Sequence, residues 1–233
     1  MSAWDLTDPE IRIARKKLAA IIPVGSLEQH GKHLPVSTDS EIVTHVAERV
    51  AKKCGLLLMP TIPYGVSFEH APFFNLSIKA STLQMLLLEM CLSLGQNKVR
   101  RVIILNGHHG NQDALKGIEQ KVRRLSKGKV CVVALSYWHF MEREFDHAGF
   151  VETSLMLALS NKVKMSLAKR GFDASELDPK SRSRISKLAQ TQFVKATKTG
   201  VWGDPTKATK RDGTKIMSEI VQNITKTVSK MTW

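Results

Sequence analysis

Short apolar runs and helically spaced apolar series alternate along the chain. Four runs rich in Ile, Val and Leu predict buried strands, at residues 18–24, 56–59, 101–105 and 130–135. Helically spaced series follow the runs at 38–53, 82–94, 114–125 and 150–159. The repeated strand–loop–helix order predicts an α/β protein with a mostly parallel sheet and helices on both faces.

The remaining segments add helices at the two ends of the chain. Residues 8–17 predict a short opening helix, and a final helix carries Ile216 to Val228 at intervals of four residues. The segment 82–94 is apolar on nearly every face, which predicts a helix buried in the core or against another subunit. The polar, basic stretch 171–212 is expected to wrap the domain as loops and short helices. Since no linker interrupts the pattern, we expect one domain over residues 1–233.

Clusters of His, Asp and Glu follow the predicted strands. They occupy residues 25–39, 64–70, 106–111 and 137–147. In an open α/β sheet the loops after the strands meet at the carboxyl edge, where such folds bind ligands. The sequence therefore predicts one site built from four loops.

The charge balance favours anionic partners. The chain of 233 residues has 35 Lys and Arg against 21 Asp and Glu, a net charge of +14. We expect a small-molecule substrate that is anionic or phosphorylated. A nucleic-acid-binding protein is the alternative, and it predicts steeply salt-dependent binding and indifference to chelators. With two Tyr and no basic stripe interleaved with aromatic residues, nucleic acid is not the expected partner.

Cysteine usage and the amino terminus indicate a cytoplasmic protein. Cys54, Cys91 and Cys131 show no CxxC spacing, so they predict free thiols in a reducing compartment. The first residues are acidic and lack the apolar core of a signal peptide. No apolar run approaches the roughly 20 residues that cross a bilayer, so no membrane association is expected.

The clustered residues supply carboxylates and imidazoles without sulfur. This mixture suits zinc, manganese or iron(II), and a bridging carboxylate allows two divalent ions about 3.5–4 Å apart. The candidate metal ligands are Glu28, His30, Asp39, His108 and Glu152. The alternative is a set of polar surface loops whose histidines only donate hydrogen bonds.

The other histidines receive different interpretations. His147 precedes the helix that carries Glu152, where a histidine can protonate a leaving nitrogen as general acid. The alternative for His147 is an ordinary loop histidine. His33 and His45 are interpreted as bystanders, and so individually are His70 and His139, although these two could line the pocket.

Five segments in a characteristic order resemble the creatininase family of metal-dependent amidohydrolases. They are PVGSLEQHGKHLPVSTD (23–39), PYGVSFEH (63–70), NGHHGN (106–111), DHAGFVETS (146–154) and GVWGDPTKATKRDG (200–213). The resemblance implies a three-layer α/β/α fold, a homo-oligomer that is typically a hexamer, and a binuclear site that hydrolyses a non-peptide C–N bond.

The resemblance also implies roles for individual residues. It makes Glu28, His30, Asp39 and His108 metal ligands, with Asp39 bridging, and it makes His147 the catalytic histidine. Creatinine-cleaving members carry a glutamate where this chain has Gly110.

Glu152 is our candidate for that missing carboxylate, as a metal ligand that also takes part in catalysis. A second departure from the family is the stretch 72–77, where many relatives have Pro-Gly-Thr. We expect the substrate to contact four further residues: His70, Ser77, His109 and Trp138.

Three branches of the family define the expected reaction. One removes formate from a formamidopyrimidine ribonucleotide monophosphate in flavin and deazaflavin biosynthesis. Because a phosphorylated substrate fits the charge of +14, we expect this deformylation. The alternatives are ring opening of creatinine and cleavage of a short C-terminal piece from a cofactor precursor peptide.

Overall fold

A four-stranded parallel sheet forms the middle of the molecule. The computed structural model describes residues 1–14, 19–174 and 177–231. The strands are β1 (Ala20–Val24), β2 (Leu57–Leu58), β3 (Arg101–Asn106) and β4 (Cys131–Ser136), in the order β2-β1-β3-β4. All the pairings between them are parallel. The prediction of a mostly parallel sheet is confirmed, while residues 15–18, which include parts of a predicted helix and strand, lie outside the described residues.

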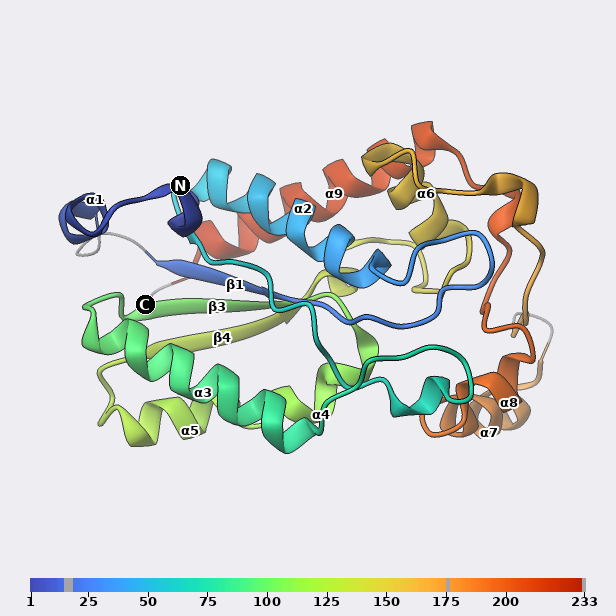
Figure 1. The fold of residues 1–233 in the computed structure, drawn as a ribbon, viewed down its shortest axis with the longest axis horizontal. Helices are drawn as coiled ribbons and strands as arrows, with labels where there is room; N and C mark the ends of the chain where they lie inside the picture. The colour runs from blue at the N-terminus through green and yellow to red at the C-terminus, as the bar shows by residue number, and fades with distance from the viewer. Residues whose placement is uncertain (15–18, 175–176, 232–233) are drawn as a thin grey trace.

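Helices cover both faces of the sheet (Figure 1). One layer consists of α2 (Thr38–Cys54), α6 (Phe150–Leu159) and α9 (Lys210–Ser229); the other consists of α3 (Ala80–Gln96), α4 (Gln112–Leu115) and α5 (Ile118–Leu125). Because successive side chains of a strand point to opposite faces, Ile21 and Ile103 pack into the first layer, and Ile22 and Ile104 into the second. The predicted three-layer α/β/α fold is confirmed.

Two predictions about the second layer need correction. The predicted helix 114–125 is divided at Lys116 and Gly117, where Gly117 has a φ of 69° that breaks the helical geometry. Helix α3 buries only one face in the core, because Met85 is 54% exposed and Leu86 is 40% exposed. All-round burial within the chain's own core is therefore wrong, and contact of the other face with a second subunit stays a prediction.

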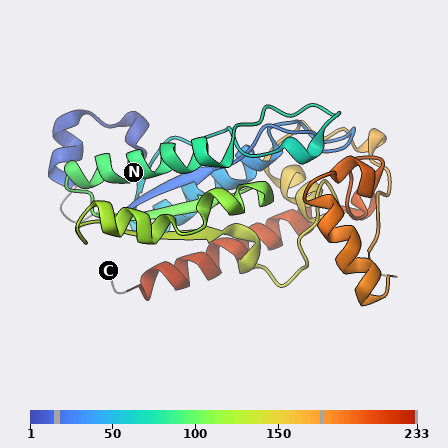
Figure 2. The same ribbon diagram turned by 90° about the horizontal axis from the view of Figure 1, so that it is seen from below.

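The basic stretch contributes two short helices at one end of the molecule. These are α7 (Pro179–Ala189) and α8 (Phe193–Thr197), which both views place beyond the carboxyl ends of the strands (Figures 1 and 2). The opening helix α1 spans Asp8–Ala14. Short 3-10 helices occupy Ala3–Asp5, Phe68–His70, His109–Asn111, Tyr137–Phe140, Met165–Leu167 and Pro205–Lys207. Over the part of the chain that the structure describes, no helix combines the length and apolarity needed to span a membrane.

Candidate metal centre

The loops after the strands bring the predicted ligands together at the carboxyl edge of the sheet. Glu28 and His30 lie in the loop between β1 and α2, and Asp39 occupies the first turn of α2. A carboxylate is favourable in that position because the helix dipole is positive there. His108 follows β3 directly, and Glu152 lies in the first turn of α6. All five candidate ligands are buried.

The first set of ligand atoms, called the Glu28 group, comes from Glu28, Asp39 and His108. Their ligand atoms lie within 4.8 Å of one another. His108 Nδ1 is 3.0 Å from Asp39 Oδ2, and its Nε2 lies 2.8 Å from the carbonyl oxygen of Val66. Since a carbonyl can only accept, Nε2 carries a hydrogen and Nδ1 is left to bind a cation. This pairing of a ligand imidazole with a backbone carbonyl is usual at protein metal sites.

The second set, called the His30 group, comes from His30, Asp39 and Glu152. His30 Nε2 lies 3.2 Å from Asp39 Oδ1 and 3.4 Å from Glu152 Oε2. The other ring nitrogen, Nδ1, lies 3.1 Å from the carbonyl oxygen of Glu28, so that Nε2 is again the free nitrogen. Asp39 therefore directs one oxygen toward each group. His147 also lies close enough to His30 and Glu152 to share a cation with them.

Four buried polar atoms of these two groups make no hydrogen bond with the described residues. They are Glu28 Oε1, His30 Nε2, Asp39 Oδ2 and Glu152 Oε1. Other nitrogen and oxygen atoms lie near them, but the directions do not suit hydrogen bonds. Leaving such atoms unpaired is costly, whereas a cation between them would satisfy all of them. The donors present therefore fit divalent metal ions.

Burial and charge shift the protonation of the cluster. Burial alone would lower the pKa of His30 and of His108, but the neighbouring carboxylates, above all Asp39 for His30 and Glu28 for His108, raise each to about 10. Burial raises the pKa of Glu152 to about 8, against the opposing effect of His30. Without metal, the cluster thus holds protons that a bound cation would displace.

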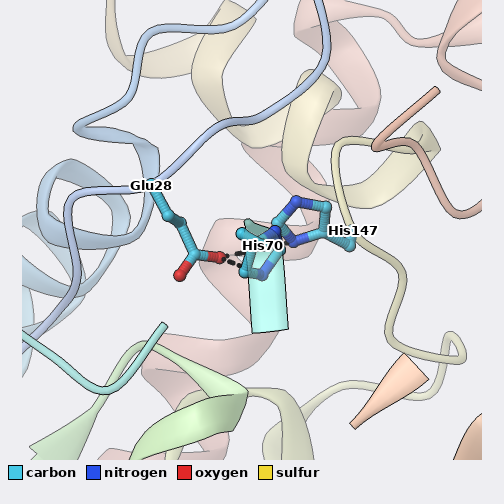
Figure 3. A group of neighbouring side chains, drawn as sticks. All are labelled: Glu28, His70 and His147. Atoms are coloured by element: carbon cyan, nitrogen blue, oxygen red, sulfur yellow. Dashed lines mark ion pairs between the residues drawn. The ribbon is translucent and has the colours of Figure 1, made fainter. Parts of the chain in front are cut away.

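His147 lies beside both groups and reaches the cavity. Its Nδ1 is 3.8 Å from Glu28 Oε1, and its ring centre is 4.2 Å from that of His30. Figure 3 shows that His70 and His147 both face the same oxygen of the Glu28 carboxylate. Burial first, and then the positive charge of His30, lowers the pKa of His147 well below its ordinary value. This imidazole is consequently neutral near pH 7.

A cavity of about 480 Å³ opens over the cluster. All four loops predicted from the sequence contribute to it, which confirms their convergence. The basic stretch adds Arg182 from α7 and Phe193 from α8 to its wall. The volume falls in the range of sites that enclose ligands of drug size.

The four predicted substrate contacts have different surroundings. His70 and His109 line the cavity. Trp138 does not: its ring stacks on Phe145 at 4.8 Å between centres and is buried in the core. Ser77 does not either, because its hydroxyl accepts a hydrogen bond from the backbone N–H of Ser67. The structure thus gives Trp138 and Ser77 packing and hydrogen-bonding roles away from the cavity wall, and substrate contact by these two residues stays a prediction.

The remaining histidines lie away from the ligand atoms. His33 Nε2 is 2.8 Å from Thr153 Oγ1 in the interior, and His45 pairs with Glu48 on the outer surface of α2. His139 is exposed and is not part of the cavity wall.

Two groups of cavity residues were not predicted from the sequence. Glu69 places Oε1 3.9 Å from His108 Nε2, and its position directly before His70 was a usable signal. Arg182 and Phe193 lie in a stretch without periodicity, which offered no such signal.

Gly110 is held by close packing. A β-carbon there would lie 2.1 Å from the Val66 carbonyl oxygen and 2.7 Å from Glu69 Oε1. A side chain at this position requires a shift of the loop that carries Val66. The backbone around residue 110 therefore leaves no room for the glutamate that creatinine-cleaving relatives carry there.

A buried cluster of carboxylates and imidazoles at the carboxyl edge of a parallel sheet defines an α/β protein with a candidate metal centre. A family model described as Creatininase, creatinine amidohydrolase, matches residues 4–228. The chain therefore belongs to the creatininase family of hydrolases. Among relatives, the mycofactocin precursor peptide peptidase of Mycobacterium ulcerans (strain Agy99) is 34% identical over 225 residues, covering 91% of this chain and 85% of that protein.

Solved structures of creatininases resemble the whole chain. One described as creatininase Mn has a TM-score of 0.80 and 27% identity, covering 98% of this chain and 97% of that one. A glutamate-to-glutamine mutant of Zn-Zn type has a TM-score of 0.78 and 26% identity, with the same coverage. A formamidopyrimidine nucleotide deformylase of Methanococcus voltae (strain ATCC BAA-1334 / A3) is 33% identical, but over only 43% of this chain and 38% of that protein.

Proposed function

We propose that the chain is an amidohydrolase that uses two divalent metal ions. The Glu28 group would hold one ion and the His30 group the other, with Asp39 shared between them. The observation that carries this proposal is the direction of the two Asp39 oxygens, one toward each group. Ions held there would lower the pKa of a bound water and polarise the amide carbonyl. The manganese and zinc forms among the solved relatives support the choice of metals.

His147 is proposed to carry the proton of the reaction. The sequence predicted a general acid, but the lowered pKa leaves the ring neutral at the start. A neutral ring must first accept a proton from the attacking water before it can donate one to the departing nitrogen. His147 therefore serves as base and then as acid within one turnover.

The substrate is proposed to be a linear amide that carries an anionic end. The cavity volume of about 480 Å³ is larger than a small cyclic amide such as creatinine would fill. Lys116 and Arg182 on its wall pair with Asp113 and Glu144, and the carboxylate or phosphate of a substrate would take the place of these partners. The near full-length similarity to a peptide peptidase supports a short peptide with a free carboxyl end.

Deformylation of a formamidopyrimidine ribonucleotide is the second candidate. The net charge of +14 supports a phosphorylated substrate. The similarity to deformylases covers less than half of the chain, so it supports this candidate less strongly than the peptide.

The test is hydrolysis of three substrate classes by protein loaded in turn with manganese, zinc and iron(II). Mass spectrometry would detect a released peptide fragment, formate assay would detect deformylation, and creatine would report ring opening of creatinine. We expect metal-dependent release that disappears in Asp39→Ala and persists in His45→Ala, which alters an exposed histidine of the same helix. Equal activity in Asp39→Ala would contradict the proposal.

We also propose that residues 1–233 act as one domain that assembles into a homo-oligomer. The exposed apolar side chains of α3 and the neighbouring loop, among them Met85 and Phe74, support such a contact. Light scattering on the purified protein should give a multiple of 26.0 kDa. A monomer at micromolar concentration would contradict the assembly.

A further inference from the structure

The side chain of Gln29 lies between the two candidate metal ligands Glu28 and His30, yet it points toward histidines. Its amide is buried, and two backbone groups fix its orientation. The N–H of Gly31 donates to Gln29 Oε1 at 3.0 Å, and Gln29 Nε2 donates to the carbonyl oxygen of Gly200 at 3.1 Å. A backbone N–H only donates and a carbonyl only accepts, so a flipped amide would fail at both contacts.

This orientation determines which nitrogen of His70 carries a proton. The second hydrogen of the Gln29 amide points to His70 Nδ1, 2.9 Å from Gln29 Nε2. Nδ1 must therefore present a lone pair, since two donors at that distance repel each other. A neutral His70 then has its hydrogen on Nε2, the atom that faces Glu28 Oε1 at 3.0 Å.

The backbone of the same residue orients His147. His147 Nε2 lies 3.1 Å from the carbonyl oxygen of Gln29, which requires a hydrogen on Nε2. Both hydrogens of the amide are already used, so the 3.2 Å approach of Gln29 Nε2 to this nitrogen is not a further hydrogen bond. His147 Nδ1 is left as a free lone pair on the side of Glu28 (Figure 3).

The two histidines consequently differ in what they can do. By distance alone, Glu28, His70 and His147 form a third set of atoms able to hold a cation. A protonated Nε2 cannot bind a metal, whereas it can stabilise the charge of a carboxylate that does. We infer that Gln29 is a positioning residue that excludes His70 from the metal ligands and keeps its protonated Nε2 3.0 Å from Glu28 Oε1. The inference rests on the proposed function only in treating Glu28 as a metal ligand.

Gly200 explains how the amide is held. A β-carbon at residue 200 would lie 2.1 Å from Gln29 Oε1, and the φ of Gly200 is 73°. Only glycine provides both the conformation and the close approach. This gives a role to the segment 200–213, which contributes none of the proposed metal ligands.

The experiment is nitrogen NMR of the full chain labelled with ¹⁵N-histidine, first metal-free and then with zinc. His70→Ala and His147→Ala assign the two rings. We expect both rings of the unsubstituted protein to carry hydrogen on Nε2 and none on Nδ1, with His70 unchanged by zinc. Loss of the His70 Nε2 hydrogen on adding zinc would overturn the inference, because that atom would then be a ligand.

Two substitutions test the role of the amide. In Gln29→Glu the carboxylate can only accept, so the hydrogen of His70 should move to Nδ1 and free Nε2 for zinc. X-ray absorption should then detect an added nitrogen ligand. Gln29→Met should lower kcat more than it raises KM, while Gln120→Met on the exposed side of α5 should match the unsubstituted protein.

An unchanged His70 pattern in Gln29→Glu would overturn the inference. The NMR measurement on the unsubstituted protein stands even if both variants fail to fold. Because it requires no substrate, an inactive protein would refute the proposed reaction and leave this test intact.

Discussion

The two ligand groups share Asp39 but differ in the protonation of their other carboxyl group, which is Glu28 in one and Glu152 in the other. In the Glu28 group the carboxyls of Glu28 and Asp39 both have a lowered pKa, since positive imidazoles outweigh the effect of burial. In the His30 group Glu152 has a raised pKa of about 8. The carboxyls of the first group are therefore ionised near pH 7 and only His108 must give up a proton to a cation, whereas the second group must lose a proton from Glu152 as well as from His30. We expect the Glu28 group to bind the tighter ion.

Removal of the shared carboxylate should have the largest effect. Asp39→Ala takes one oxygen from each group, so both ions should be lost and hydrolysis should become undetectable. Metal analysis after gel filtration and the amidase assay measure the two effects. If one equivalent of metal remained at full affinity, Asp39 would be a ligand in only one group. That result would contradict the claim that the two groups share Asp39.

Removal of the proton carrier should affect the rate and not the metal. His147→Ala should lower kcat by about 10²–10⁴-fold, the usual contribution of general acid–base catalysis. Two equivalents of metal should remain bound. Loss of one equivalent together with activity would instead make His147 a ligand of the His30 group, which its distances to His30 and Glu152 permit.

Substitution of each unshared carboxylate should separate the two groups. Glu152→Gln should weaken only the weaker ion and Glu28→Gln only the tighter ion. Loss of a residue that only hydrogen-bonds a metal ligand typically lowers metal affinity by roughly 10–100-fold. Loss of a direct ligand should lower the affinity by at least as much. Competition with a chromogenic chelator measures both constants. Identical weakening of the same ion by the two variants would contradict the assignment.

Lower pH should produce a smaller difference, seen in the metal affinities of the two groups. Below pH 8, Glu152 is protonated in the metal-free protein, so binding to the His30 group displaces this proton in addition to that of His30. Affinity for the second ion should therefore fall with decreasing pH about tenfold more per unit than affinity for the first. Zinc titrations between pH 8 and 6 measure how each affinity depends on pH. Equal slopes for the two ions would contradict the claim that only the His30 group must lose a carboxyl proton.

The parts of this structure that sequence could predict are those governed by local pattern. The apolar runs located the strands, and the loops after them located the cluster, because a parallel sheet must bring its carboxyl ends together. The break between α4 and α5 was missed since the apolar spacing continues across Gly117.

Contacts made by distant packing could not be predicted in this way. Trp138 follows a strand as the site residues do, but its ring turns into the core against Phe145. Arg182 and Phe193 reach the cavity only through the placement of α7 and α8. The orientation of Gln29 depends on Gly200, which lies far away in sequence.

Titration of zinc into metal-free protein at pH 8, followed by calorimetry and metal analysis, tests the central claim most directly. The account predicts two equivalents that bind in two resolved steps, with both steps absent in Asp39→Ala. A single equivalent, or two equivalents that survive the loss of Asp39, would contradict it.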